Sequence, residues 1–299
     1  MDLLDLVGNT PLVNLGFLSP CPDRIAFYGK AEWMNPGGSL KDRPVKQMLC
    51  AALAAGELHK DRIVLDSSSG NAGISYAMIG GALKRKVCIV IPGNASRERK
   101  ERLCAHGAEL IETDPLEGYD AALRHVREMY EAEPERYFFC DQYSNTNNVL
   151  AHYKGTAVEL IEQVARPITH FICGVGTGGS LTGIGRRLRE RYPQVKIVGV
   201  MPERWPGIEG LKPLGEPEDI VPDIFDGSLV DEWVPVSADD ARAHCHMLAH
   251  WGYFLGQSSG AYVAVCAKVM AELEQTGAEA VVTTLLCDFG ERYFSAGLW

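Results

Sequence analysis

The sequence predicts an α/β protein with mainly parallel sheets and two domains. Short apolar runs alternate with amphipathic segments along almost the whole chain, a pattern typical of strands connected by crossover helices. The run Val87–Ile91 is apolar at every position, as expected for a strand that is buried on both faces. A chain of 299 residues with 46% hydrophobic content is long enough to form two domains.

The first half of the chain is expected to alternate strands with helices. After Ser39, apolar residues at positions 45, 48, 49 and 52 have the spacing of one helix face, and Gly56 is suited to end that helix. The strands are expected at residues 24–31, 63–65, 87–91, 110–111 and 137–140, and the further helices at 74–83, 96–106 and 119–131.

The second half repeats this scheme around one irregular stretch. Helices are expected at residues 147–164, 181–191, 238–251 and 261–274, and strands at 171–173, 196–200 and 280–287. Residues 202–235 are rich in proline and glycine and break the pattern. Because long irregular loops in compact domains are usually functional, we expect this stretch to cover a site.

The composition argues against several classes of partner. The formal net charge is −10 and no tract is rich in Lys and Arg, so neither nucleic acid nor an anionic membrane is an expected partner. No apolar run approaches the ~20 residues of a membrane span. The cysteines are scattered without a Cys-x-x-Cys pair, and the first residues are acidic rather than basic. A reduced, cytoplasmic protein is therefore expected.

Two further patterns have ordinary explanations. The charged run Arg97–Arg102 is expected to be a solvated helix surface. His246 and His250 lie one helical turn apart, as a metal pair would. No carboxylate completes a known metal motif, so a partly exposed helix face is the preferred interpretation and no metal is expected.

Lys41 occupies an unusual position for a charged lysine. It follows two glycines in the stretch Asn35–Pro44 and lies in the first turn of an expected helix. A helix N-terminus carries about half a positive charge and repels an ammonium group. A neutral amine or an imine is easier to keep there, which is what Schiff-base chemistry with pyridoxal phosphate (PLP) requires. An ordinary surface lysine is the alternative.

A first glycine-containing turn, Ser67–Gly73, lies between an expected strand and an expected helix. Its hydroxyl and backbone N–H groups converge at the positive end of that helix, which suits a carboxylate. The residues in question are Ser68, Ser69, Gly70, Asn71 and Ala72. A serine N-cap followed by turn glycines is the simpler alternative.

A second glycine-rich turn, Gly174–Gly183, also separates a strand from a helix. Its glycines allow the backbone to close around a phosphate, with hydroxyl donors at Thr177 and Ser180. The turn also fits G-x-G-x-x-G, so an NAD-binding protein with Glu203 as the ribose acid is an alternative. Glu203 lies farther away than the usual ~20 residues, and that interpretation leaves Lys41 without a role.

Two polar positions could contact a ligand. Gln142 ends an expected strand, where parallel-sheet enzymes place ligand groups. Ser258 lies in Gln257–Gly260, just before an expected helix, where a serine N-cap is an equally good explanation.

Together these motifs resemble the cysteine synthase family, the O-acetylserine sulfhydrylases, nearly from end to end. The stretch Asn35–Arg43 resembles the family's PLP-lysine motif, which is highly specific. The other matching stretches are Gly8–Val13, Ser68–Gly73, Gly176–Ser180 and Gly290–Ser295. Without a long C-terminal extension, the chain is more similar to the B isozyme.

The resemblance implies the tryptophan synthase β-like fold of PLP fold type II, with two three-layer αβα domains. The N-terminal domain is expected to comprise residues 1–12 and 35–145, and the C-terminal domain residues 13–34 and 146–299. A homodimer is also implied. Because some relatives accept sulfur from a carrier protein, such a protein is a candidate partner.

The resemblance also assigns roles to individual residues. Lys41 is expected to form an imine with PLP, Asn71 to bond the ring hydroxyl, and Ser258 to face the pyridine nitrogen. The implied phosphate loop is Gly176, Thr177, Gly178, Gly179 and Ser180. The implied substrate contacts are Ser68, Ser69, Gly70, Asn71, Ala72 and Gln142.

The implied reaction replaces the β-substituent of an activated serine, O-acetylserine or O-phosphoserine, with sulfide or another sulfur donor to give cysteine. Replacement with an amino nucleophile and deamination of serine or threonine are alternatives. Ala72 stands where the family has threonine, which removes a hydroxyl donor worth ~0.5–1.5 kcal/mol. Gln257 is polar where the family usually has an apolar residue. Residues 203–218 are expected to choose the donor.

Overall fold

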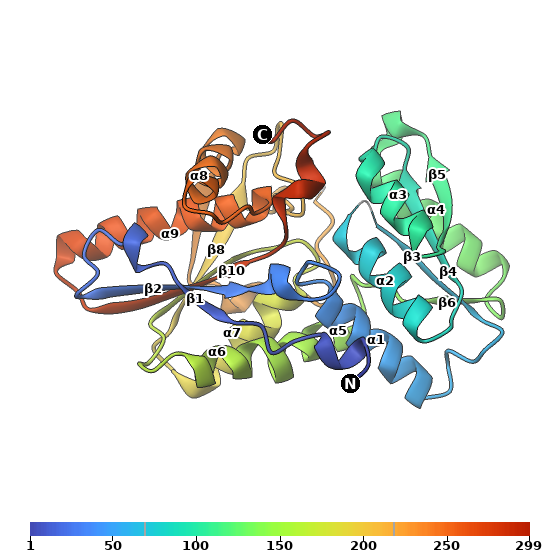
Figure 1. Ribbon diagram of the computed structural model, residues 1–299, viewed down its shortest axis with the longest axis horizontal. Helices are drawn as coiled ribbons and strands as arrows, with labels where there is room; N and C mark the ends of the chain where they lie inside the picture. Colours follow the sequence, from blue (N-terminus) through green and yellow to red (C-terminus); the bar gives the residue numbers. More distant parts are fainter. Residues whose placement is uncertain (69, 218) are drawn as a thin grey trace.

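The computed structural model describes residues 1–68, 70–217 and 219–299, with the side chains of 117–120 left aside. Its described strands form two sheets, the larger at the left and the smaller at the right of Figure 1. The order in the larger sheet is β1 (Leu12–Asn14), β2 (Ile25–Ala31), β10 (Ala280–Leu286), β7 (His170–Gly174), β8 (Lys196–Pro202) and β9 (Glu232–Val236). Only the β1–β2 pair is antiparallel among these described strands.

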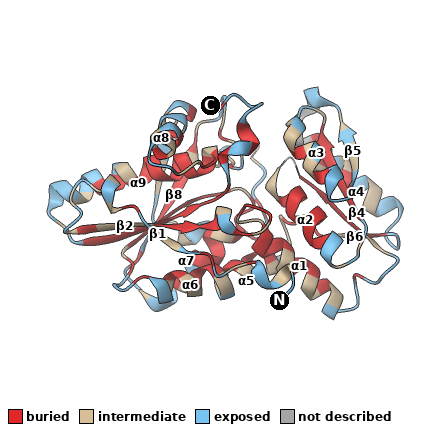
Figure 2. Cartoon of the chain, in the orientation of Figure 1, coloured by how far each residue is buried: buried red, intermediate tan, exposed pale blue. Residues whose placement is uncertain are grey.

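The larger sheet has helices on both faces. Helices α8 (Ala238–His250) and α9 (Gln257–Thr276) cover one face, and α5 (Thr146–Ala151), α6 (Ala157–Gln163) and α7 (Gly179–Arg191) cover the other (Figure 1). β10 is buried at every position, as both faces of a central parallel strand should be. Figure 2 shows buried residues along these strands and on the inner faces of the helices.

The smaller sheet is parallel throughout its described strands, in the order β5 (Glu109–Thr113), β4 (Val87–Pro92), β3 (Ile63–Ser67) and β6 (Tyr137–Phe139). Alternate residues of β3 and β4 enter two separate cores. One core includes residues of α1 (Asp42–Ala54), α2 (Asn71–Ala82) and α3 (Arg97–Ala105), and the other includes residues of α4 (Gly118–Ala132).

The α/β class and the parallel sheets are confirmed, and several expected bounds need correction. Residues 202–235 were expected to be wholly irregular, but β9 begins at Glu232 and adds a parallel edge strand to β8. Its Pro235 is tolerated because prolines occur at sheet edges. The expected helix 147–164 is interrupted by a π-helical turn, His152–Thr156. Helices α2 and α9 begin earlier than expected, at Asn71 and Gln257.

The larger sheet combines β1 and β2 with β7–β10, which begin at His170, while β3–β6 form the other sheet. Residues 13–34 were expected to group with residues 146–299. The division into two domains at those boundaries stays a prediction.

Candidate active site

A cavity of about 330 Å³ lies where the glycine-rich turns of both sheets meet. It is lined by residues that follow β3, β6 and β7, because the carboxyl ends of parallel strands form the ligand edge of such sheets. The lining residues are Lys41, Ser68, Gly70, Asn71, Ala72, Arg99, Gln142, Tyr143, Gly176, Thr177, Glu209, Gly210, Leu211, Lys212 and Tyr293.

Lys41 is the N-cap residue of α1 and faces this cavity. Burial of its amine lowers the pKa of Lys41, and the neighbouring Cys287 and Cys173 oppose that shift. No carboxylate of the described chain is among the groups that act on this amine. A lysine in this environment is more readily neutral at physiological pH, and therefore nucleophilic, than a surface lysine.

Asp42 fixes the turn that carries Lys41. Its carboxylate accepts hydrogen bonds from the backbone N–H of Gly37 and the hydroxyl of Ser75, both at 2.5 Å. Arg292 donates to the carbonyl of Gly37 from the other end of the chain. Burial raises the pKa of Asp42 to about 6, although these hydrogen bonds oppose the shift. The lysine turn is thereby tied to α2 and to the C-terminal motif.

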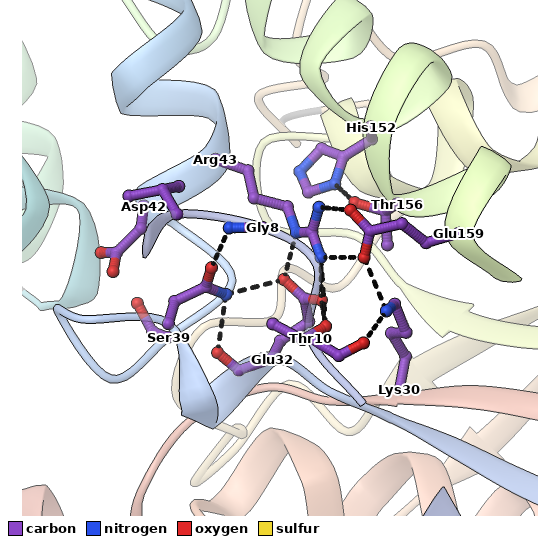
Figure 3. Close-up of polar contacts among 12 residues, drawn as sticks. Gly8, Thr10, Lys30, Glu32, Ser39, Asp42, Arg43, His152, Thr156 and Glu159 are labelled. Carbon is purple, nitrogen blue, oxygen red and sulfur yellow. Dashed lines mark hydrogen bonds and ion pairs between the residues drawn. The ribbon is translucent and has the colours of Figure 1, made fainter. Parts of the chain in front are cut away.

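A buried ionic network lies directly behind this turn (Figure 3). Arg43 donates two hydrogen bonds to Glu32, at 2.6 and 2.8 Å, and two to Glu159, at 2.6 and 2.7 Å. Lys30 pairs with the second oxygen of Glu159 at 2.6 Å. Asn35 donates to Glu32 and accepts from Gly8. This network therefore connects residues 8–13 to residues 35–43, the two stretches that resemble the family motifs, and it fixes the backbone on both sides of Lys41.

The predicted carboxylate loop precedes α2 and lines the cavity. The Ser68 hydroxyl oxygen accepts hydrogen bonds from the N–H groups of Gly70, at 3.2 Å, and Gly73, at 2.9 Å. These bonds orient the hydroxyl so that its proton is available to a ligand. Ala72 is buried, belongs to the core shared by α1, α2 and α3, and also lines the cavity. Ser69, also predicted to contact substrate, lies outside the described residues.

Asn71 lines the cavity and is held by the C-terminal motif. Its amide nitrogen donates to Asp288 at 2.7 Å, and its amide oxygen accepts from Arg292 at 2.5 Å. Tyr293 donates to the same Asp288 oxygen at 2.7 Å. Among the described residues the Asn71 amide donates to Asp288, which leaves its second N–H for a ligand. This geometry is compatible with the predicted contact to a ring hydroxyl.

The predicted phosphate loop leads from β7 into α7. Gly176 and Thr177 line the cavity, whereas Gly178, Gly179 and Ser180 lie outside its wall. The N-cap Gly178 has φ +83° and provides no side-chain cap, so the first N–H groups of α7 are open to an anion. A Cβ at Gly179 would lie 2.0 Å from Asn148. The loop is therefore a bare backbone cradle of the kind that binds phosphate.

Gln142 and Ser258 both lie near the cavity, but only Gln142 lines it. Gln142 lines the cavity and donates to the carbonyl of Ser67 at 3.0 Å. Ser258 is outside the wall, in the first turn of α9, beside the Cys287 thiol that acts on Lys41. The Ser180 hydroxyl oxygen is 3.7 Å from the sulfur of Cys173, the second thiol that acts on Lys41.

The expectation that Arg97–Arg102 forms a solvated surface is wrong for Arg99. Its side chain is 5% exposed, pairs with Glu209 and lies 5.1 Å from the ring centroid of Tyr293. Leu103, one turn later on the same helix face, is also buried. Leu103 was the signal in the sequence that the Arg99 face of this helix is buried, since positions i and i+4 share a face.

The remaining motifs contribute no site in the described part of the chain. His246 lies 3.0 Å from the carbonyl oxygen of Leu298, which anchors the C-terminal segment. Residues 1–68, 70–217 and 219–299 contain no cluster of His, Cys, Asp or Glu that could hold a metal ion. In the same ranges, no helix is long and apolar enough to cross a membrane.

Comparisons with known proteins agree with this geometry. Residues 3–288 match the family described as pyridoxal-phosphate dependent enzyme. The chain is 42% identical to a cysteine synthase of Aquifex aeolicus, covering 99% of this chain and 91% of that protein. It is 36% identical to cysteine synthase B of Escherichia coli, covering 98% and 94%.

Solved structures give the same result. A crystal structure of cysteine synthase from Entamoeba histolytica superposes with a TM-score of 0.90 at 30% identity, covering 100% of this chain and 90% of that one. A crystal structure of O-ureido-L-serine synthase superposes with a TM-score of 0.91 at 32% identity, covering 99% and 94%. These likenesses support PLP over NAD as the ligand of the second glycine-rich turn. The chain therefore belongs to the pyridoxal-phosphate dependent enzymes, with the tryptophan synthase β-like fold and full-length relatives among the cysteine synthases.

Proposed function

We propose that this enzyme replaces the acetoxy group of O-acetyl-L-serine with sulfide to give L-cysteine. The observation that carries the proposal is the Lys41 amine, which faces the cavity without a carboxylate partner in the described chain, between a carboxylate-type turn and a phosphate-type turn. The full-length cysteine synthase relatives support the same reaction.

The residues present fit PLP. The bare helix N-terminus at Gly178–Gly179 would hold the phosphate, together with Gly176, Thr177 and Ser180. Asn71 would donate its second N–H to the ring hydroxyl, and the neutral Ser258 would face the ring nitrogen. When bound, PLP supplies an aldehyde that condenses with amines and a ring that withdraws electrons from the adjacent carbon.

The chain's own groups would then bind the amino acid and move its proton. The Ser68 hydroxyl and the N-terminal N–H groups of α2 would bind the substrate carboxylate, with Gln142 beside them. Lys41, once free, would take the proton from the α-carbon, because its lowered pKa leaves more neutral amine near pH 7. Asp42 would keep the lysine turn in place through its bonds to Gly37 and Ser75.

The test measures cysteine formed from O-acetylserine and sulfide by the PLP-loaded enzyme. Cysteine formation that requires both reactants and is lost in Lys41→Ala supports the proposal. Keto-acid release without a nucleophile would instead indicate deamination. A product containing a second amino acid in place of sulfide would indicate an amino nucleophile.

Three further expectations belong to this proposal. We keep the homodimer and the cytoplasmic location as predictions, because the family resemblance implies the first and the scattered cysteines favour the second. A sulfur-carrier protein as donor also remains a prediction. It would be favoured if a carrier's thiocarboxylate gave cysteine faster than free sulfide at equal concentration.

A further inference from the structure

The outer wall of the cavity carries an ion pair that joins the two halves of the molecule. Arg99 comes from α3, beside the smaller sheet (Figure 1), and Glu209 from the irregular segment after β8. Both side chains line the cavity. The Arg99 side chain is 5% exposed, whereas that of Glu209 is 34% exposed.

This pair lies directly over the predicted carboxylate loop. A Cβ built on Gly70 would be 3.7 Å from the Arg99 guanidinium carbon and 3.8 Å from a Glu209 carboxylate oxygen. A substrate whose carboxylate is bound at this loop would therefore lie close to the Glu209 carboxylate. Glu209 and Lys41 line the same cavity, so the group at the substrate's β-carbon would share this cavity with the Glu209 carboxylate.

The backbone around Glu209 is fixed by two hydrogen bonds. The Gln257 side chain accepts from the N–H of Glu209 at 3.1 Å, and the N–H of Lys212 donates to the carbonyl of Val175 at 2.7 Å. Gln257 is one of the positions at which the sequence departs from the family pattern. The polar side chain of Gln257 therefore has a structural role, because its hydrogen bond to the Glu209 N–H holds Glu209 at the cavity wall.

The charge at this wall decides which β-substituent is favourable. Glu209 neutralises the buried Arg99, and the Lys212 ammonium lies 5.1 Å from the ring centroid of Tyr143. A phosphate ester would add a charge of about −1.5 to −2 beside the Glu209 carboxylate. An acetyl ester adds no charge, whereas a phosphate could pair with Arg99 if Glu209 did not already hold that guanidinium. Glu209 therefore disfavours the phosphate ester relative to the acetyl ester, although Arg99 and Lys212 carry positive charge at the same wall.

We propose that Glu209 is a specificity-determining residue, which makes this cavity select an uncharged acyl ester over a phosphate ester as the leaving group. This inference rests on the proposed β-replacement and adds the residue that sets the preference for its donor. It assigns a function to the segment 203–218, whose sequence alone did not identify the donor.

The experiment compares kcat/KM for O-acetylserine and O-phosphoserine, with sulfide as the second substrate. Wild type should prefer O-acetylserine. Glu209→Gln keeps a hydrogen-bond acceptor for Arg99 but removes the charge, and it should shift the ratio toward O-phosphoserine by roughly tenfold, mainly through KM. Glu209→Asp retains the charge and should keep the wild-type preference.

Glu216→Gln is the matched control, since it removes the same charge from the same segment at an exposed residue outside the cavity wall. It should leave the ratio unchanged. Inorganic phosphate should inhibit Glu209→Gln more strongly than wild type when O-acetylserine is the donor. A ratio in Glu209→Gln within about twofold of wild type, or a wild type that prefers O-phosphoserine, would overturn the inference while β-replacement still stands. Absence of cysteine from both donors in wild type would overturn the proposed function, and this inference with it.

Discussion

Replacing Arg43 with methionine should destabilise the folded protein more than any substitution of a surface arginine. Arg43 lies two residues after Lys41, and its side chain is 5% exposed. The guanidinium forms ion pairs at 2.6 Å with Glu32, which is fully buried, and with Glu159, which is 12% exposed. Methionine fills much of the same volume but leaves both carboxylates without their main cation.

The expected cost follows from this burial. Removing one partner of a buried ion pair typically costs about 3–5 kcal/mol, because the remaining charge stays desolvated. Lys30 still pairs with Glu159 at 2.6 Å, so the loss falls mainly on Glu32. Native proteins are stable by only about 5–15 kcal/mol, so the substitution should remove a large part of the total stability.

Urea unfolding followed by tryptophan fluorescence measures this difference in the free energy of unfolding. Arg187→Met is the matched control, because Arg187 is 42% exposed and pairs with an exposed Glu190. It should cost less than about 1 kcal/mol. Adding Glu32→Gln to Arg43→Met should recover part of the loss by removing the stranded charge. Equal, small losses for Arg43→Met and Arg187→Met would refute the reasoning.

Three other predictions concern separate parts of the site. Burial alone would raise the pKa of Glu159, but Arg43 and Lys30 lower it from 4.5 to about 2. Its contribution to stability is therefore present above pH 4.5 and lost as the pH falls toward 2. The difference in unfolding free energy between wild type and Glu159→Gln should shrink over that range, and a constant difference would contradict this. Ala72→Thr should lower the KM for O-acetylserine by about two- to tenfold, since one hydrogen bond is worth ~0.5–1.5 kcal/mol. Ala72→Val, the same shape without the hydroxyl, should not lower it, and identical behaviour of the two variants would count against a role for the hydroxyl. Gly178→Ala adds a Cβ 2.6 Å from that of Phe225 at φ +83°, and equilibrium dialysis should show PLP affinity reduced by at least about tenfold. Gly215→Ala, with φ +124° and open space around it, should bind PLP as wild type does, and equal losses in both variants would exclude the crowding argument.

The features predicted well from the sequence are those whose causes are local. The helix spacing after Ser39 and the glycine at position 56 are confirmed by α1 and by the positive φ of Gly56. The two glycine-rich turns precede α2 and α7 as expected. In each case the residues that determine the conformation are neighbours in the chain.

The features that were missed depend on residues far apart in the sequence. Arg99 is separated by 110 residues from Glu209, so a charged run gave no sign that one of its members is buried. Asn71 is held by Asp288 and Arg292, more than 200 residues away. β9 escaped prediction because its five residues include a proline and only its edge position permits it.

The central claim is that Lys41 carries PLP, and chemical trapping tests it most directly. Burial also lowers the pKa of Lys30, but that amine is paired with Glu159 and bonded to Gln163 at 3.0 Å. Borohydride reduction of the PLP-loaded enzyme, followed by peptide mass spectrometry, identifies the modified lysine. We predict the label on Lys41 alone and its loss in Lys41→Ala. A label on Lys30, or on no lysine, would contradict the account.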